Sequence, residues 1–217
     1  LEQILQDQFL LENFKQNYLS SLKNDLSFLK NSICVVLDDN QFNTKYVSQE
    51  LEYNLKLLNY AIDDIKERVL DIVNVFKITN LLDYRIEELT VEEKMLIKIL
   101  SLLIIRPQFI GIDGLLCYLK KEAIKKIFNY AETYNISVMY STSNAEELRY
   151  SDTTIVLNNL KSVLISDSEE IVKGNSILPY MGIKLPFAAD LSQNLMLYGL
   201  VDDVILDNRK LVNKIWK

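Results

Sequence analysis

The stretch Leu89-Thr90-Val91-Glu92-Glu93-Lys94 decides the fold predicted for this chain of 217 residues. Thr90 and Glu93 have the spacing of a capping box, in which the threonine oxygen accepts the Glu93 N–H and the glutamate carboxylate accepts the Thr90 N–H. We therefore predict that a helix begins here. The residues that follow are mostly apolar as far as Ile105, so the predicted helix extends to that point.

This predicted helix is apolar around most of its circumference, at Met95, Leu96, Ile99, Leu100, Leu102 and Leu103. Such a distribution is typical of a helix packed inside an α/β layer rather than one lying on a surface. Pro107 ends the helix, because proline lacks the N–H that a helix interior requires. Residues 109–113 then predict a short buried strand that ends on the carboxylate of Asp113.

The composition argues against several classes of function. With 49% hydrophobic and 25% charged residues, the chain is expected to be globular rather than disordered. Its formal charge of −6 speaks against nucleic-acid binding, which needs clustered Lys and Arg. Histidine is absent, so the commonest general base and the commonest metal ligand are missing. We assign no catalytic residue and no metal site.

Two further features predict the compartment. The longest uncharged apolar run, from Ile99 to Ile105, is far shorter than the roughly 20 residues of a membrane span, and no signal peptide opens the chain. We therefore expect a cytosolic protein. Cys34 and Cys117 lie in apolar sequence without metal-ligand spacing, which predicts two buried thiols rather than a disulfide.

Strand-like and helix-like patterns alternate over the rest of the chain. The predicted strands are residues 32–37, 109–113 and 136–140, then a pair, 153–157 and 162–165, joined across Asn158-Asn159. The predicted helices are residues 12–29, 48–76 in two pieces that part near Asn59-Tyr60, and 120–134, with a helical turn at 144–148. Residues 1–11 predict a short hairpin, and residues 201–205 an edge strand or a loop. Alternation from residue 32 to residue 165 predicts a parallel α/β sheet.

Several short segments, taken in their order, carry a resemblance to a known family. They are residues 34–37, Asp39-Asn40-Gln41-Phe42, and residues 46–55, 89–93, 106–113, 140–143, 150–158 and 185–216. In this order they resemble the Q-loop strand, the following Asp-Asn-Gln segment, the next helix, the signature Leu-Ser-Gly-Gly-Gln, Walker B, the H-loop and the C-terminal part of an ABC transporter nucleotide-binding domain. More narrowly, they resemble the ATPase subunits of energy-coupling-factor (ECF) importers.

The resemblance implies the fold class and the division of the chain. It implies an α/β fold of the P-loop NTPase type, with a parallel sheet and a helical subdomain at roughly residues 43–105. The N-terminal part of that fold is expected to be absent. Residues 1–173 would form a partial ABC ATPase-like domain, and residues 174–217 a small C-terminal extension of the ECF type.

The chain departs from this family at the positions that carry catalysis. No G-x-x-x-x-G-K-[ST] motif, whose backbone holds phosphates, occurs in the sequence. The family places this P-loop before the segment that matches Leu1, so it has been lost or lies outside this chain. The Q-loop glutamine aligns with Val36, the catalytic glutamate with Gly114, the H-loop histidine with Thr142 and the D-loop aspartate with Lys120.

The signature-like segment, Leu89, Thr90, Val91, Glu92 and Glu93, departs in a way that has a physical reading. In the family, two glycines let the N-terminus of a helix approach a phosphate bound to the partner subunit. Val91 and Glu92 stand in their places, so Cβ atoms block the approach and carboxylates occupy the positive end of the helix. We predict that this terminus repels phosphate.

Three other assignments have an alternative. Asp113 is a remnant of a nucleotide-bound Mg²⁺ site or a structural residue, and Thr142 is an H-loop position or a helix cap. The third is a docking surface for the membrane-embedded T component, or else a polar loop before an ordinary amphipathic helix. The docking residues would be Asp39, Asn40, Gln41, Phe42, Val47, Glu50, Leu51 and Tyr53.

Three functions follow as hypotheses. The first is a degenerate, non-hydrolysing subunit that pairs as a heterodimer with an intact ABC ATPase and docks on an ECF transmembrane coupling protein, peripheral on the inner face of the cell membrane. ATP and Mg²⁺ would then bind only through the partner subunit. The second is an ATP-binding or weakly hydrolysing ATPase whose P-loop lies upstream of Leu1. The third is an orphaned, decaying paralogue.

Overall fold

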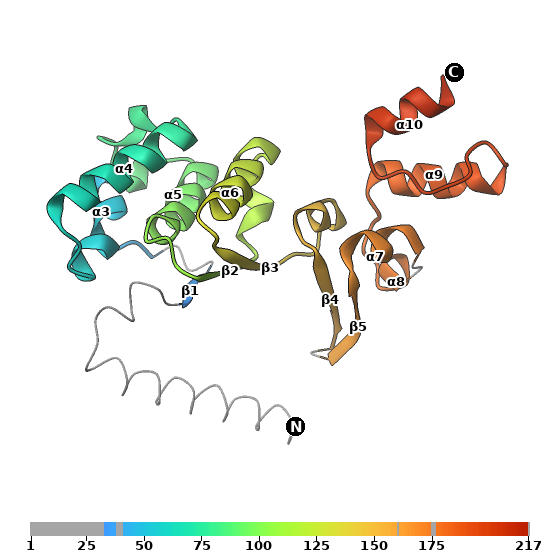
Figure 1. Cartoon of the computed structure of the whole chain (residues 1–217), viewed down its shortest axis with the longest axis horizontal. Helices are drawn as coiled ribbons and strands as arrows, with labels where there is room; N and C mark the ends of the chain where they lie inside the picture. Colours follow the sequence, from blue (N-terminus) through green and yellow to red (C-terminus); the bar gives the residue numbers. More distant parts are fainter. Residues whose placement is uncertain (1–32, 38–40, 160, 175–176, 217) are drawn as a thin grey trace. The chain divides into compact units, whose positions relative to one another are not determined.

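The computed structural model describes residues 33–37, 41–159, 161–174 and 177–216 (Figure 1). The hairpin predicted for residues 1–11 and the helix predicted for residues 12–29 lie outside these ranges, as do Asp39 and Asn40. Contacts divide the chain into two compact units, residues 1–141 and residues 142–217. Each unit is described by itself.

The first unit contains a parallel sheet of three strands, β1 (Ile33–Val36), β2 (Phe109–Asp113) and β3 (Ser137–Ser141). β2 lies in the centre, with Val36 opposite Ile112 on one side and Ser141 opposite Asp113 on the other. The three predicted strands and their parallel arrangement are confirmed. The carboxyl ends of the strands therefore lie along one edge of the sheet, where ligands bind in open α/β folds.

Among the described residues of this unit, the sheet is accompanied by α3 (Val47–Leu57), α4 (Ile62–Phe76), α5 (Val91–Leu103) and α6 (Lys121–Thr133). The short 3-10 helices are η1 (Thr79–Leu81), η2 (Ile86–Glu88) and η3 (Leu115–Tyr118). Figure 1 shows α3 to α6 on the same side of β1, β2 and β3. The helical region predicted between residues 48 and 76 forms two helices that part at Asn59 and Tyr60, as expected.

Helix α5 is the centre of the core of this unit. Ile97, Ile99, Leu100 and Leu103 are fully buried, and the helix packs against α3, β1 and β2. Burial of each such side chain stabilises the fold by about 1.5–3 kcal/mol. The sequence prediction of an internal helix is confirmed.

The opposite face of the sheet is open in the part of the chain that the structure describes. Successive residues of a strand point to opposite faces. Val36, Ile110 and Ile112 are buried beneath the helices, whereas Ile33, Val35 and Met139 are at least half exposed. The sequence predicts β1 to be a buried strand, and the described residues bury it on one face only.

The capping box that opens α5 forms as predicted. Thr90 Oγ1 accepts the Glu93 N–H at 3.3 Å, and Glu93 Oε2 accepts the Thr90 N–H at 2.9 Å. Thr90 has extended backbone angles, as a residue outside the first turn requires. The helix ends at Leu103, two residues before the predicted end, and Arg106 in the following turn has a φ of +55°.

A polar network holds α4 against α6 and the turn before β2. Asp71 Oδ2 accepts hydrogen bonds from Arg106 Nη2 at 2.7 Å, Tyr134 OH at 2.7 Å and Tyr130 OH at 3.2 Å. The Arg106 guanidinium also lies 3.6 Å from the centroid of the Tyr134 ring. Burial alone would raise the pKa of Asp71, but the hydrogen bonds from Tyr134, Arg106 and Tyr130 outweigh it and lower that pKa. Burial raises the pKa of Tyr130 to about 12.

Arg68, also on α4, extends this attachment to the C-terminus of α5. Its Nη1 donates to the carbonyl oxygens of Ile104 and Ile105 at 3.1 and 3.0 Å. Carbonyl groups at the end of a helix have no partner within the helix, so a cation there is favourable.

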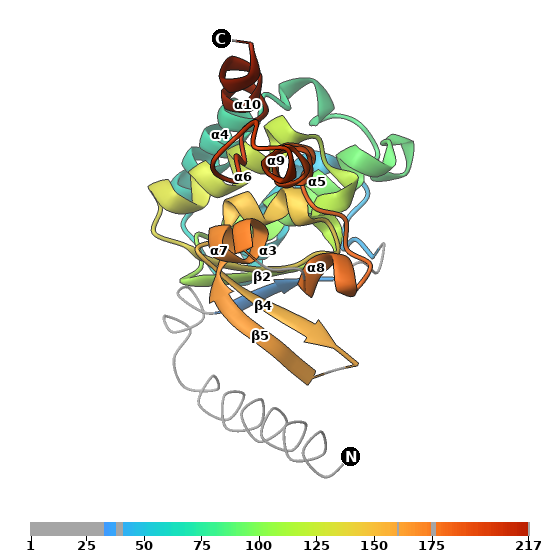
Figure 2. The same cartoon turned by 90° about the vertical axis from the view of Figure 1, so that its right-hand side faces the viewer.

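The second unit contains η4 (Ala145–Tyr150), the strands β4 (Thr153–Asn158) and β5 (Lys161–Asp167), and the helices α7 (Ser168–Gly174), α8 (Ile177–Tyr180), α9 (Phe187–Leu197) and α10 (Asn208–Ile215). β4 and β5 form an antiparallel sheet of their own (Figure 2). The strand pair predicted for residues 153–157 and 162–165 is therefore confirmed. In the described residues the parallel sheet ends at Ser141, so the prediction that it continues to residue 165 is wrong. Asn158 pairs with Lys161, so the turn begins one residue later than expected. Residues 201–205 form a loop.

An apolar cluster joins η4, β4 and the helices α7, α8 and α9 of this second unit, and a smaller cluster of Ala188, Val201 and Leu211 packs α10 against α9. Ala145, Val156, Ile171, Leu178 and Ala189 are among the buried members of the larger cluster. The predicted boundary between residues 173 and 174 falls inside this packed cluster. The assignment of residues 174–217 to an ECF-type extension remains a prediction.

The two cysteines differ from each other. Cys34 is half-buried, and burial raises the pKa of its thiol to about 11. Cys117 is exposed on η3, so the prediction that both thiols are buried is wrong for Cys117. The two do not form a disulfide, as expected.

Replacing Asp71 with asparagine should lower the free energy of unfolding by about 1–3 kcal/mol, because three donors lose an ionised acceptor in a half-buried site. Urea unfolding measures this change. Asp64→Asn is the matched control, because Asp64 is an exposed aspartate on the same helix, and it should change stability by less than about 0.5 kcal/mol. Equal effects of the two variants would contradict a stabilising role of the hydrogen bonds to Asp71.

The contribution of Asp71 should also depend on pH. Its pKa in the folded chain is below its ordinary value of 3.8, so protonation favours unfolding. The stability difference between the native chain and Asp71→Asn should be present in full above about pH 5 and shrink as the pH falls below about 4. Urea unfolding across this range measures it, and a difference that does not change with pH would be the opposing result.

Replacing Glu93 with alanine should lower the free energy of unfolding by about 1 kcal/mol, because it removes one half of the capping box. Glu122→Ala is the control, since Glu122 lies in the first turn of α6 but has no capping role. Thermal unfolding of both variants measures the difference. A loss no larger than that of Glu122→Ala would show that the capping box contributes nothing beyond the helix dipole.

Candidate functional site

Asp113 stands at the carboxyl end of the central strand β2, where the family's Walker B aspartate is expected. Ser141, opposite it on β3, donates its hydroxyl to Asp113 Oδ1 at 2.5 Å and accepts the Gly114 N–H at 2.9 Å. The carboxylate is therefore fixed by a neighbouring side chain of its own sheet. Gly114 has a φ of +68°, a conformation that glycine adopts without strain.

Asp113 offers one carboxylate at this strand end, and its role as a remnant of a Mg²⁺ site or as a structural residue remains a prediction. Mg²⁺ sites use carboxylate oxygens together with phosphate oxygens and water. The next residue is Gly114, which brings no carboxylate, and one oxygen of Asp113 already accepts from Ser141. Within the described ranges, no group of three or more Cys, Asp or Glu residues could hold a metal ion.

The other two degenerate positions are Val36 and Thr142, and they belong to different units. Val36 is the last residue of β1, opposite Ile112, and its aliphatic side chain is buried. Thr142 is the first residue of the second unit, and its Oγ1 accepts the Asn144 N–H at 2.9 Å. The cap of η4 is Asn144, whose side chain accepts the Glu146 N–H at 3.0 Å, so the predicted capping role of Thr142 belongs to Asn144.

The signature-like segment forms the start of α5. Leu89 is buried, Thr90 and Glu93 form the capping box, and Val91 is 58% exposed as the first residue of the helix. A branched side chain thus stands on the surface where the family has a glycine. The two carboxylates of the first turn bind donors of the chain itself.

Glu92 makes a contact that the sequence did not predict. Its Oε2 lies 2.9 Å from Lys120 Nζ, and its Oε1 accepts the Lys120 N–H at 3.2 Å. The hydrogen bond from Lys120 lowers the pKa of Glu92, and the same bond raises the pKa of Lys120. The signature-like and D-loop-like positions are therefore bonded to each other within one chain. Residues so far apart in sequence leave no local pattern that could have indicated the pair.

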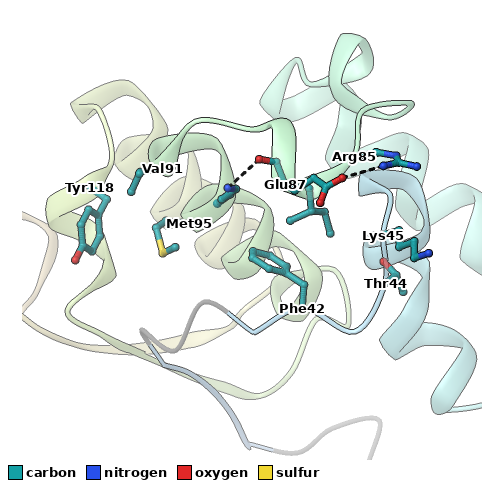
Figure 3. Close-up of a pocket in the computed structure, with 10 residues that line it drawn as sticks. Phe42, Thr44, Lys45, Arg85, Glu87, Val91, Met95 and Tyr118 are labelled. Atoms are coloured by element: carbon teal, nitrogen blue, oxygen red, sulfur yellow. Dashed lines mark hydrogen bonds and ion pairs between the residues drawn. The ribbon is translucent and has the colours of Figure 1, made fainter.

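A cavity of about 630 Å³ lies beside the start of α5 (Figure 3). It is lined by Phe42, Thr44, Lys45, Arg85, Ile86, Glu87, Val91, Lys94, Met95 and Tyr118. In Figure 3, Tyr118 and Val91 stand at one end, Lys45 and Arg85 at the other, and Phe42 and Met95 between them. Pockets of this volume are typical of sites for small ligands or for a partner's side chains.

The walls of this cavity are tied together by hydrogen bonds. The Ile86 N–H donates to the Lys45 carbonyl at 2.9 Å, Arg85 pairs with Glu87 at 2.9 Å, and Lys94 Nζ donates to the Glu87 carbonyl at 3.2 Å. The buried carboxylate of Glu50 fixes the loop that carries the cavity wall. It accepts the N–H groups of Asn43 and Thr44 at 3.1 and 2.9 Å.

The predicted docking residues separate into two groups. Gln41 is exposed, Tyr53 is half-buried and Phe42 lines the cavity. Val47, Glu50 and Leu51 are buried and therefore position the loop and α3 rather than face a partner. The prediction from the sequence did not include Arg85, Lys94 and Tyr118, which line the cavity from other segments. Whether this region docks a partner remains a prediction.

None of the helices described is both long and apolar enough to cross a membrane.

Comparison with known proteins finds similar sequences among ATP-binding proteins of energy-coupling factor transporters. No protein-family model matches the chain. It is 25% identical over 184 residues to the energy-coupling factor transporter ATP-binding protein EcfA1 of Streptococcus thermophilus, a match that covers 82% of this chain and 67% of the relative. The corresponding EcfA1 protein of Streptococcus pyogenes serotype M1 is 26% identical over 182 residues, which are 82% of this chain and 65% of that relative. The chain thus spans about two thirds of these proteins.

Solved structures agree with the fold. The structure of cbiO1 from Clostridium perfringens, described as part of the ABC transporter complex cbiONQ, superposes with a TM-score of 0.58 over 75% of this chain and 67% of that one, at 20% identity. An ATP-binding subunit of an ABC transporter gives a TM-score of 0.59 over 80% of this chain and 72% of that one, at 13% identity. The chain has the fold of an ABC ATPase domain, and its sequence is similar, at 25% identity, to an ATP-binding protein of energy-coupling factor transporters.

Proposed function

We propose that this chain is a non-hydrolysing, structural ATPase-like subunit of an ECF-type importer. It would pair with an intact ABC ATPase and dock on the transmembrane coupling protein, peripheral to the inner face of the cell membrane. The relatives are ATP-binding proteins of ECF transporters, which supports the transporter context.

The state of the α5 N-terminus carries this proposal. A helix end that binds phosphate needs exposed N–H groups and no competing negative charge. Here the Thr90 hydroxyl accepts a hydrogen bond from the Glu93 N–H, and the Glu93 carboxylate accepts one from the Thr90 N–H. The Glu92 carboxylate forms an ion pair with Lys120. The exposed side chain of Val91 stands where a phosphate would approach the start of the helix. A phosphate would have to displace these contacts and approach two carboxylates.

The surroundings of Asp113 support the same conclusion for the position where the family has its Walker B aspartate and catalytic glutamate. A hydrolysing site needs a group that orients the attacking water. The residue after Asp113 is Gly114, and the hydroxyl that contacts the carboxylate belongs to Ser141. Glycine has no side chain, and a serine hydroxyl does not take a proton from water at neutral pH. In a heterodimer, this chain would therefore contribute shape and contacts rather than chemistry.

A second candidate function rests on the extent of the match. About a third of the S. thermophilus relative lies outside it, and that protein is named an ATP-binding protein. If a P-loop belongs to this protein upstream of Leu1, the full protein would bind ATP. The coding sequence before Leu1 tests this candidate directly through the presence or absence of G-x-x-x-x-G-K-[ST].

Titration of the 217-residue chain with a fluorescent ATP analogue and Mg²⁺ should give no saturable binding, or a Kd weaker than about 1 mM. An intact ECF ATPase subunit, measured in the same way, is the positive control. The chain should nevertheless co-purify with its ATPase and coupling partners in the absence of nucleotide. Saturable binding by the chain alone would contradict the proposal, and so would a folded chain that ignores both partners.

A further inference from the structure

We propose that residues 12–29 form an amphipathic helix that packs on the open face of the parallel sheet, over β1 and β2. Two observations point to this contact: an apolar sheet face that no described segment covers, and an apolar stripe in the sequence directly before β1. The contact goes beyond the proposed function, since it completes the core of the first unit whether or not a partner binds.

The open face of the sheet presents an apolar surface on both outer strands. Ile33 and Val35 on β1, and Leu37 directly after it, are each at least half exposed. Met139 on β3 is 60% exposed. Val35, Gly111 and Met139 are in register on the three strands and therefore belong to the same face. Parallel sheets are normally covered on both faces, so this face requires a cover in the folded protein.

Gly111 shapes the middle of this face. It adds no side chain to the central strand, and a Cβ atom placed there would lie 3.5 Å from a methyl group of Val35. A glycine in a strand often marks a place where another element approaches the backbone closely. The side chains of a covering helix can therefore reach the backbone of β2 between Val35 and Met139.

The segment before β1 has the apolar stripe that such a face requires. Residues 12–29 lie outside the described ranges, and the helix is predicted from their spacing alone. Apolar residues recur there at intervals of three or four, at Phe14, Tyr18, Leu22, Leu26 and Leu29. The opposite side of the predicted helix carries small polar residues, Asn13, Asn17, Ser20, Asn24 and Ser27. This is the pattern of a helix with one side on a core and the other in water.

The short connection to β1 determines which surface this helix can reach. Residues 30–32 separate the predicted helix from Ile33, and loops of this length commonly join a helix to a strand. A helix attached so closely packs beside β1, and α5 already occupies the other face of that strand. Attachment through three residues also keeps the local concentration of the segment far above that of a second chain. The open face is therefore the surface that this segment meets first.

The dimensions of a helix suit this face. Residues 12–29 would span about 27 Å as a helix, longer than the roughly 17 Å of a five-residue strand such as β2. A helix is about 10 Å wide and strands are about 4.8 Å apart, so one helix covers about two strands. Asp25 lies at the margin of the stripe and stays in water, and Lys15 can extend its ammonium to water along its aliphatic stem. A face closed in this way is not available to another segment of the protein or to a partner.

The rate of thiol modification at Met139→Cys tests whether the face is covered. The whole chain carries Cys117→Ser as well, which removes the exposed native thiol, and peptide mass spectrometry distinguishes position 139 from Cys34. Leu22→Asp should speed maleimide labelling by about tenfold or more, because an unpaired carboxylate against an apolar face favours the open state. Ser20→Asp, on the polar side of the predicted helix, is the matched control and should change the rate by less than about twofold.

A second measurement identifies the occupant without altering the stripe. A nitroxide attached at Met139→Cys should broaden the NMR signals of Tyr18 and Leu22 in the same chain. In a mixture of spin-labelled chains with isotope-labelled chains that carry no nitroxide, those signals should stay sharp, because the cover comes from the same molecule. The maleimide labelling rate should likewise not depend on protein concentration.

Four results would overturn the inference. They are an unchanged labelling rate in a folded Leu22→Asp chain, an equal acceleration by Ser20→Asp, sharp signals of Tyr18 and Leu22 in the spin-labelled chain, and broadening in the mixed sample, which would assign the cover to a second copy. If circular dichroism shows that Leu22→Asp does not fold, the nitroxide measurement decides alone. The nucleotide titration and the co-purification test the proposed function separately, so either can fail without the other.

Discussion

The contacts at the two ends of α5 determine the arrangement of the first unit. At its start, Thr90 and Glu93 cap the helix while Glu92 bonds to Lys120 at the start of α6. At its end, Arg68 of α4 binds the carbonyls of Ile104 and Ile105. Because α5 lies in the core between α3 and the sheet, these polar contacts at its ends set the positions of α4 and α6 as well. The same glutamates that fix the helix also occupy the place where a phosphate would bind.

Local patterns predicted much of this fold. The spacing of Thr90 and Glu93, the uncharged β-branched run at residues 33–36 and the apolar run that ends at Asp113 each depend on neighbours in sequence, and each element formed where expected. What local patterns could not predict depends on distant partners. The turn at Asn158-Asn159 predicted that β4 and β5 pair with each other, but no local pattern showed that this pair forms a sheet separate from β1, β2 and β3. Likewise, the apolar neighbours of Cys117 gave no sign that η3 turns its side chain to solvent.

Some residues of the candidate site could likewise be predicted from the sequence, and others could not. The apolar pattern of residues 109–113 predicted Asp113 at a strand end, and the resemblance then gave Val36, Gly114 and Asp113 their motif positions. The cavity could not be predicted, since Lys45, Arg85, Lys94 and Tyr118 come from four segments that no periodicity connects. The hydrogen bonds of Asp71 to Arg106, Tyr130 and Tyr134 were missed for the same reason. The chemistry of contacts between segments appears only when the chain is folded.

The register of the sheet has a consequence for the order in which the chain folds. Pairing Phe109 with Ser137 closes only the segment that contains α6, whereas pairing Ile33 with Phe109 closes the much longer segment that contains α3, α4 and α5. Closing the longer loop costs more chain entropy, and contacts of long sequence separation form slowly. We therefore expect β2 and β3 to associate before β1 pairs with β2. During synthesis β1 leaves the ribosome before its partner strand, so its apolar residues must wait for most of the unit to be made.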